Sequence, residues 1–150
     1  MRVGFIGLGN VGAKLSGVSP RGRKVGRNEK RSIDMKIGFI GLGNVGGKLS
    51  GSLLRNGVDL YVHDLETELV AGFVARGARD GGSPAQLMQA CDTVITCLPS
   101  PAACAAVMEQ MLPEMVPGKT WIEMSTTDAS EVRRLAEQVN AVGAEAVECP

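Results

Sequence analysis

Lys36–Ser50 reads KIGFIGLGNVGGKLS, and this stretch decides the fold of the 150-residue chain. A strand is predicted over 36–41 and a helix over 45–56, so Gly41-Leu42-Gly43-Asn44-Val45-Gly46, a G-x-G-x-x-G pattern, forms the turn between them. The first glycine permits a tight turn, the second lets a phosphate approach the backbone, and the third lets the helix pack against the strand. Free N–H groups and the helix dipole attract the anion. The stretch therefore predicts a site for the pyrophosphate of a dinucleotide.

An acidic residue closes the next predicted strand, 58–63. This residue is Asp64, eighteen positions after Gly46. A carboxylate there can accept hydrogen bonds from the adenosine ribose hydroxyls of NAD, and it repels the 2′-phosphate of NADP. We therefore expect NAD as the favoured cofactor and NADP as the alternative. His63 is the only histidine of the chain and lies at the adenosine end, so it is assigned to cofactor binding rather than to catalysis.

Strand and helix patterns alternate from there to the end of the chain. Helices are predicted over 66–75, over 83–90, after Ser100-Pro101 and after Asp128, and strands over 78–79, 92–98, 120–124 and 144–148. Ser83-Pro84-Ala85-Gln86 combines an N-cap, a first-turn proline and a capping-box glutamine. The alternation predicts an α/β fold of the Rossmann type, with a doubly wound, mostly parallel sheet covered on both faces.

The start of the chain nearly duplicates the deciding stretch. Met1–Gly17 and Met35–Gly51 are identical at fourteen of seventeen positions. After Gly17, however, Pro20 and a basic, glycine-containing run leave little apolar surface for a helix and a second strand. We therefore expect residues 1–34 to be an N-terminal extension, with a partial copy of the first strand and turn plus a basic linker. Residues 35–150 are expected to form an NAD(P)-binding domain.

The formal net charge of zero combines two unlike segments. Residues 1–34 hold eight basic and two acidic side chains, and residues 35–150 hold the other eight basic and fourteen acidic ones. The basic run has no interleaved aromatic residues, so a solvated linker is favoured over a nucleic-acid tether. No apolar run approaches the roughly 20 residues that span a bilayer, and no secretory signal is found. A cytoplasmic protein without a membrane partner is expected.

The cysteines do not suggest a disulfide framework or a metal site. Cys91, Cys97, Cys104 and Cys149 form no C-x-x-C pair and have no histidine at metal-ligand spacing. We expect four free thiols in a reducing cytosol. Cys91 and Cys97 are interpreted as core residues rather than nucleophiles, and Trp121 as a core residue of a strand.

Over Met35–Pro150 the chain resembles the N-terminal domain of the β-hydroxyacid dehydrogenase family, which includes 3-hydroxyisobutyrate and 6-phosphogluconate dehydrogenases. The resemblance rests on KIGFIGLGNVGGKLS and on CLPSP, EMSTTD and ECP, which begin at Cys97, Glu123 and Glu148. It implies that the Gly41–Gly46 turn holds the pyrophosphate and Asp64 the adenosine ribose. It also implies that Leu98 and Pro99 line the cofactor and that Ser125 and Thr126 lie near the nicotinamide. A second strand that is followed by Asp64 is more similar to the NAD-using 3-hydroxyisobutyrate branch than to the 6-phosphogluconate branch, which typically has Asn-Arg at this position.

The same resemblance implies an incomplete enzyme. In the family, a glycine-rich substrate segment, a helix with the catalytic lysine and an all-helical domain would follow Pro150. We therefore expect the fold to be truncated before that second domain, with no catalytic residue in this chain. A small β-hydroxyacid would be the substrate only of the complete enzyme, which is a homo-oligomer in the full-length family. The alternative hypothesis is a stand-alone nucleotide-binding or regulatory module without catalysis.

Overall fold

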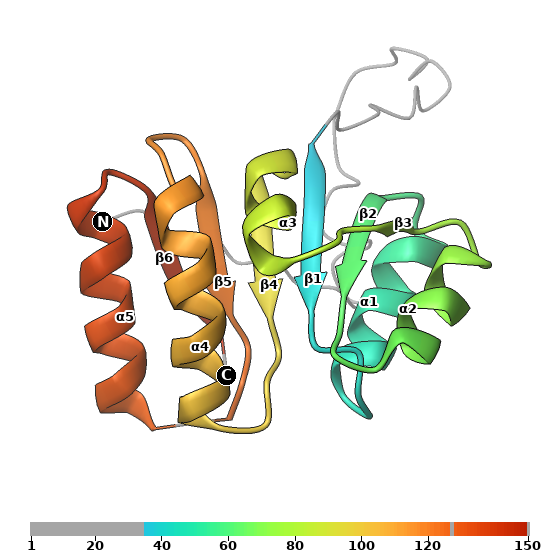
Figure 1. The fold of residues 1–150 in the computed structure, drawn as a ribbon, viewed down its shortest axis with the longest axis horizontal. Coiled ribbons are helices and arrows are strands. Elements are labelled where there is room, and N and C mark those ends of the chain that lie inside the picture. The colour runs from blue at the N-terminus through green and yellow to red at the C-terminus, as the bar shows by residue number, and fades with distance from the viewer. Residues whose placement is uncertain (1–34, 127, 150) are drawn as a thin grey trace, which may run out of the picture. The chain divides into compact units, whose positions relative to one another are not determined.

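A computed structural model describes residues 35–126 and 128–149, which contain a six-stranded parallel sheet (Figure 1). The order across the sheet is β3-β2-β1-β4-β5-β6. The strands are β1 (Lys36–Ile40), β2 (Asp59–His63), β3 (Arg79–Asp80), β4 (Thr93–Thr96), β5 (Thr120–Glu123) and β6 (Glu145–Glu148). The chain thus winds from β1 out to β3, crosses back to β4 and continues to β6. This order is that of a doubly wound Rossmann sheet and confirms the predicted fold class.

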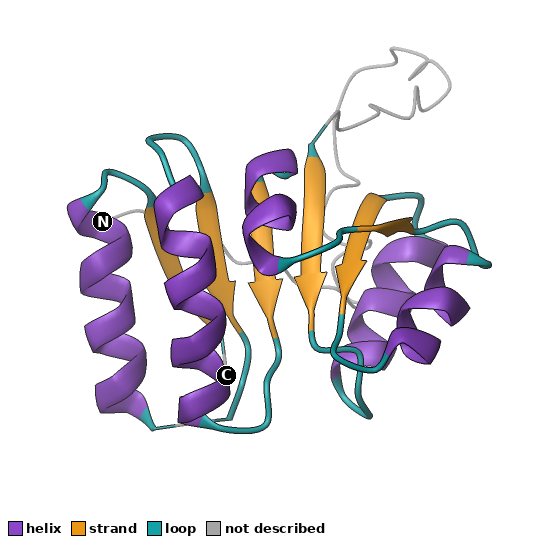
Figure 2. Cartoon of the chain, in the orientation of Figure 1, coloured by secondary structure: helices purple, strands orange, loops and turns teal. Residues whose placement is uncertain are grey.

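Helices connect the strands and cover both faces of the sheet (Figure 2). They are α1 (Gly46–Arg55), α2 (Thr67–Val74), α3 (Pro84–Ala90), α4 (Pro101–Met111) with the 3-10 turn η2 (Leu112–Glu114), and α5 (Ala129–Ala141). Apolar residues of α1 and α2 pack in one core cluster, and those of α3, α4 and α5 in another. Phe39 belongs to the first cluster and its neighbour Ile40 to the second, because side chains alternate between the faces of a strand.

Local sequence signals set where helices begin. Gln86 N donates to Ser83 Oγ at 3.3 Å, Ser83 N donates to Gln86 Oε1 at 2.9 Å, and Pro84 is the first helical residue of α3. At the start of α4, Ala103 N donates to Ser100 Oγ at 3.2 Å. Each cap satisfies an N–H group that has no partner within its helix. The predicted starts of these two helices are confirmed.

Some element boundaries differ from the predicted ones. Helix α1 begins at Gly46, one residue later than predicted, and Val45, which precedes it, is 61% exposed. Strand β3 begins one residue later than predicted, because Ala78 N donates to Phe73 O and closes the turn that follows α2. Strand β4 ends at Thr96, and Leu98 N donates to a side chain instead of to a neighbouring strand.

The predictions for residues 1–34 lie outside the described residues. Trp121 is 2% exposed and lies in the core, as predicted. The four cysteines are free thiols, with Cys91 and Cys104 buried. None of the described helices combines the length and the apolar character needed to cross a lipid bilayer.

Candidate functional site

The turn after β1 is built on Gly41. Its φ of 97° is a conformation that residues with a side chain rarely adopt. A Cβ atom at this position would also lie 2.2 Å from the carbonyl oxygen of Cys97. Gly41 N donates to His63 O at 3.0 Å, which ties the turn to the end of β2. The first glycine of the motif therefore makes a turn that no other residue can make without a backbone shift.

The second glycine opens the turn to solvent. A Cβ atom at Gly43 would meet no atom within 4 Å, and Gly43, Asn44 and Val45 are all exposed. Within the described part of the chain, the N–H groups of Asn44 and Val45 donate to no protein acceptor. They lie at the N-terminus of α1, where the helix dipole favours an anion. The turn can therefore accept a phosphate directly against the backbone.

The third glycine brings α1 against the sheet. A Cβ atom at Gly46 would lie 1.9 Å from Gly41 O and 3.2 Å from an aromatic carbon of Phe39. The fully buried Ser50 donates its hydroxyl to Gly46 O at 2.7 Å and holds the first turn of the helix. The glycine spacing thus fixes the helix terminus at the carboxyl end of β1.

Asp64 connects this turn to the end of β2. Leu42 N donates to Asp64 Oδ2 at 2.6 Å, and Glu66 N donates to Asp64 Oδ1 at 2.9 Å. Both carboxylate oxygens therefore hold backbone groups, one from the glycine turn and one from the start of α2. Each oxygen has a second lone pair, so the half-buried carboxylate can still accept a hydrogen bond from a ligand hydroxyl.

A pocket of about 440 Å³ opens beside Asp64. It lies at the carboxyl ends of β2 and β3, the edge where open α/β sheets bind ligands. Its lining combines carboxylates with apolar side chains of α2, and none of the described lining residues is a lysine or an arginine: His63, Asp64, Thr67, Val70, Ala71, Val74, Asp80 and Gly82. The pocket could hold a flat apolar group whose hydroxyl substituents face Asp64.

The loops after β4 and β5 lie on the other side of the glycine turn. A Cβ atom at Gly41 would be 3.3 Å from Leu98 Cδ2, so the loop after β4 borders the turn. Leu98 N donates to Ser125 Oγ at 2.7 Å and joins this loop to the one after β5. Ser125 is 4% exposed and faces inward, whereas Pro99 and Thr126 are exposed. The structure brings these four predicted residues to the same edge as the glycine turn.

A buried polar network behind these loops was not predicted from the sequence. Glu123 is 1% exposed, and its oxygens accept hydrogen bonds from Thr96 Oγ1 and from Ser125 N, both at 2.6 Å. Thr96 Oγ1 in turn accepts a hydrogen bond from Trp121 Nε1 at 2.8 Å. The sequence signal for this network is an acidic residue in an apolar strand. Its partner Thr96 could not be identified from the sequence, because Thr96 and Glu123 are 27 residues apart in the chain.

Neither Cys97, in the loop after β4, nor Cys91, before the opposite end of β4, is a good nucleophile. Burial, and then the negative charge of Glu123, raise the pKa of the Cys97 thiol. Burial raises the pKa of Cys91 to about 11. Little thiolate forms at neutral pH at either position, in keeping with the interpretation of these residues as structural. Among the described residues, no group of three or more His, Cys, Asp or Glu side chains could hold a metal ion.

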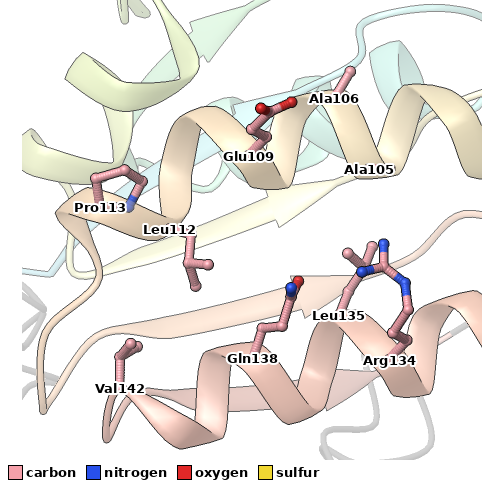
Figure 3. A pocket seen from close by; sticks show the side chains of 9 residues that line it. All are labelled: Ala105, Ala106, Glu109, Leu112, Pro113, Arg134, Leu135, Gln138 and Val142. Carbon is pink, nitrogen blue, oxygen red and sulfur yellow. The ribbon is translucent and has the colours of Figure 1, made fainter.

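A larger hollow, of about 720 Å³, lies between α4 and α5 (Figure 3). Its lining residues come from these helices and the segments that follow them: Ala105, Ala106, Glu109, Leu112, Pro113, Arg134, Leu135, Gln138 and Val142. Each helix starts at the carboxyl edge of the sheet and runs away from it, and none of these residues belongs to the first turn of either helix. The hollow therefore does not adjoin the glycine turn.

A glycine turn at a helix N-terminus, an acid at the end of β2 and a doubly wound sheet define the class of dinucleotide-binding Rossmann domains. The sequence profile described as the NAD binding domain of 6-phosphogluconate dehydrogenase matches residues 36–150, and the chain belongs to this family. It is the dinucleotide-binding domain of an oxidoreductase family.

Similar proteins include dehydrogenases. Mitochondrial 3-hydroxyisobutyrate dehydrogenase of Mus musculus is 32% identical over 151 residues, which cover 99% of this chain and 35% of the mouse protein. The human cytokine-like nuclear factor N-PAC is 34% identical over 102 residues, covering 66% of this chain and 18% of that protein. The chain thus spans well under half the length of either relative.

Similarity to solved structures supports membership of the same family. The 3-hydroxyisobutyrate dehydrogenase of Mycobacterium tuberculosis with L-serine superimposes with a TM-score of 0.72 at 26% identity, over 77% of this chain and 40% of that one. A reductive aminase from Aspergillus terreus in complex with NADPH and ethyl levulinate gives a TM-score of 0.66 at 26% identity, over 76% and 40%. The predicted resemblance to this family is confirmed.

Proposed function

We propose that the chain binds NAD and is the cofactor-binding part of an oxidoreductase that acts on a small β-hydroxyacid, similar to 3-hydroxyisobutyrate dehydrogenase. The observation that supports this most directly is the open turn at Gly43. There the N–H groups of Asn44 and Val45, which have no acceptor in the described part of the protein, lie at the start of α1. When bound, NAD would supply the hydride acceptor for oxidation of the alcohol carbon of the substrate. The residues of this chain bind and orient the dinucleotide.

Each part of the cofactor has a matching part of the site. The Gly41–Gly46 turn would hold the pyrophosphate through its free N–H groups. Asp64, with His63 beside it, would accept the adenosine ribose hydroxyls, and the pocket formed with α2 would take the adenine. The nicotinamide would then lie beside the loops after β4 and β5, bordered by the residues that join them and their exposed neighbours: Leu98, Pro99, Ser125 and Thr126.

Charge in the adenosine pocket favours NAD over NADP. Asp64 and Asp80 both line the pocket, and none of its eight described lining residues is a lysine or an arginine. Leu65, the residue after Asp64, is 93% exposed and offers no positive charge. The 2′-phosphate of NADP would therefore meet two carboxylates without a compensating cation.

Calorimetric titration of the full chain with NADH tests the proposal. We expect binding, with at least about tenfold lower affinity in Gly43→Ala, because the new Cβ takes the space that a phosphate needs. This Cβ would meet no protein atom within 4 Å, so the variant should fold normally. Gly72→Ala, in α2, is the matched control, since its Cβ is equally free. A folded protein that binds no dinucleotide, or a Gly43→Ala variant with unchanged affinity, contradicts the proposal.

A second titration tests the cofactor preference. The wild-type chain should bind NADH more tightly than NADPH. Replacing Asp64 by Asn and Leu65 by Arg removes a carboxylate and supplies a cation, so the double variant should reverse the order. If the wild-type chain binds NADPH at least as tightly as NADH, the electrostatic reasoning is wrong although dinucleotide binding itself still holds.

A stand-alone binding module is the second candidate. The loops that border the predicted nicotinamide position, Cys97–Ser100 and Met124–Thr126, contain no acid–base group other than the Cys97 thiol, whose pKa is raised mainly by burial. Hydride transfer from an alcohol needs a general base beside it. Measurable oxidation of small β-hydroxyacids by the purified chain would exclude the module. NADH binding without turnover is expected of both candidates, because neither places a catalytic residue in this chain, so only turnover distinguishes them.

A further inference from the structure

Two loops at the carboxyl edge of the sheet are joined through one buried carboxylate. Glu123, at the end of β5, is 1% exposed. Its Oε1 accepts the N–H of Ser125, which holds the backbone directly after β5. Its Oε2 accepts the hydroxyl of Thr96, the last residue of β4. The same side chain therefore fixes the ends of two neighbouring strands.

Ser125 extends the connection to the next loop. The N–H of Leu98 donates to Ser125 Oγ at 2.7 Å, so the segment after β4 is held by the segment after β5. Ser125 is itself placed by Glu123, through a backbone hydrogen bond of 2.6 Å. The position of Leu98 relative to Ser125 thus depends on a carboxylate that is buried from solvent.

The direction of the hydrogen bonds explains why a carboxylate is required. Trp121 Nε1–H donates to Thr96 Oγ1, so the hydroxyl proton of Thr96 is left to donate to Glu123. The N–H of Ser125 is also a donor. Two donors therefore converge on the two oxygens of one side chain. A glutamine of the same shape has a single oxygen, so one of the two connections would be lost.

We propose that Glu123 is a positioning residue for the nicotinamide half of the bound dinucleotide. It sets the separation of the loops that carry Leu98 and Ser125, and its hydrogen bond to Thr96 couples this separation to the environment of Trp121. The proposal rests on the proposed function, because it assigns the nicotinamide to these loops. The adenosine half lies across the glycine turn, beside Asp64, and does not depend on Glu123.

The test compares two ligands on the full chain. Wild type, Glu123→Gln and the control Glu137→Gln, an exposed glutamate of α5, are titrated with NADH and with ADP-ribose, which lacks the nicotinamide. We expect Glu123→Gln to weaken NADH binding at least about fivefold and to change ADP-ribose binding less than about twofold, because one anchoring hydrogen bond of the loops is lost. The control should bind both ligands as wild type does.

A spectroscopic signature separates positioning from general destabilisation. Trp121 is the only tryptophan of the chain, so tryptophan fluorescence reports on the surroundings of this one side chain. Glu123→Gln and Thr96→Val should both shift its emission maximum in the folded state. Thr96→Ser keeps the hydroxyl, and its emission should stay close to that of wild type. Unchanged emission in both of the first two variants would overturn the coupling between Glu123 and Trp121.

Ser125→Ala keeps the proposal testable if Glu123→Gln does not fold. This variant removes the acceptor for Leu98 N but leaves the Ser125 backbone bond to Glu123 in place. It should show the same selective loss of NADH affinity. Equal loss for NADH and ADP-ribose, or equal affinity of wild type for the two ligands, overturns the positioning role. Wild type that binds neither ligand contradicts the proposed function instead.

Discussion

The glycines of the turn after β1 differ in what a methyl group would meet at each position. At Gly43 it would enter open space, and at Gly46 it would lie 1.9 Å from the backbone oxygen of Gly41. We expect Gly46→Ala to lower the free energy of unfolding by about 3 kcal/mol or more, since the clash involves backbone that cannot rotate away. Gly43→Ala should change it by less than about 0.5 kcal/mol. Urea denaturation of both variants measures the difference, and equal stability would contradict this account.

Asp64 shows what can be predicted for a single residue. Its identity and its place after β2 were predictable, because a strand pattern and a fixed spacing from Gly46 are local features of the sequence. Its hydrogen bond to Leu42 N could not be predicted, because the two residues are 22 positions apart and meet only when β1 and β2 pair. The same holds for the bond of Glu123 to Thr96, which lies on the neighbouring strand β4.

At the scale of elements, the end of α3 depends on a side chain from outside the helix. Lys119 Nζ donates to the carbonyl oxygens of Met88, of Gln89 at 3.0 Å and of Cys91 at 2.9 Å. The last carbonyls of a helix have no partner within it, and an ammonium group also suits the negative end of the helix dipole. Lys119 therefore joins α3 to the segment that leads into β5.

Removing this cap should destabilise the fold. Lys119→Met keeps the apolar stem and deletes the ammonium group, so we expect the free energy of unfolding to fall by about 1–3 kcal/mol. Arg133→Gln, at an exposed position of α5, is the control for loss of a positive charge and should have little effect. Denaturant unfolding that does not distinguish the two variants would show that water replaces the ammonium group without cost.

The start of α5 should respond to pH. Asp128 caps this helix by accepting hydrogen bonds from the backbone N–H groups of Ser130 at 2.8 Å and Glu131 at 3.2 Å. The hydroxyl of Ser130, and then these N–H groups, hold the pKa of Asp128 below its ordinary value of 3.8. A lowered pKa in the folded state means that the cap stabilises the fold above the ordinary value. This contribution is lost as the pH falls through the folded pKa.

Comparing two caps tests this dependence. Asp128→Ala should lower the melting temperature at pH 7, and its difference from wild type should shrink as the pH falls below 3.8. Ser100→Ala removes the cap of α4, which does not titrate, so its difference should not depend on pH. Thermal melts between neutral and acidic pH measure both. A pH-independent difference for Asp128→Ala would contradict the role of the carboxylate charge.

These elements also show the limit of sequence patterns. Capping residues lie within four positions of the helix they start, so the beginnings of α3 and α4 could be predicted. The start of α1 was predicted one residue too early, because Val45 still belongs to the glycine turn that faces solvent. The cap formed by Lys119 could not be predicted, since it comes from about 30 residues further along the chain.

At the scale of the whole molecule, the choice between the two copies of the first strand gains a steric reason. The sequence favoured Met35–Gly51 because the residues after it can form a helix and a second strand. The structure adds that a Cβ atom at Gly47 would lie 2.7 Å from Leu42 O, closer than real contacts allow. The first copy has Ala13 at the equivalent position. The second copy therefore suits β1 better in two respects: the residue at this position fits the turn, and the residues that follow can form a helix and a second strand.

Exchanging the residues at this position tests that reason. Gly47→Ala gives the second copy the residue of the first, and the clash with Leu42 O should cost about 1–3 kcal/mol, which exceeds the gain of up to about 1 kcal/mol in helix propensity. Ala13→Gly makes the reverse exchange outside the described domain and should leave its stability unchanged. Chemical denaturation of the full chain measures both variants. If Gly47→Ala is as stable as wild type, the steric difference between the copies does not decide which of them forms β1.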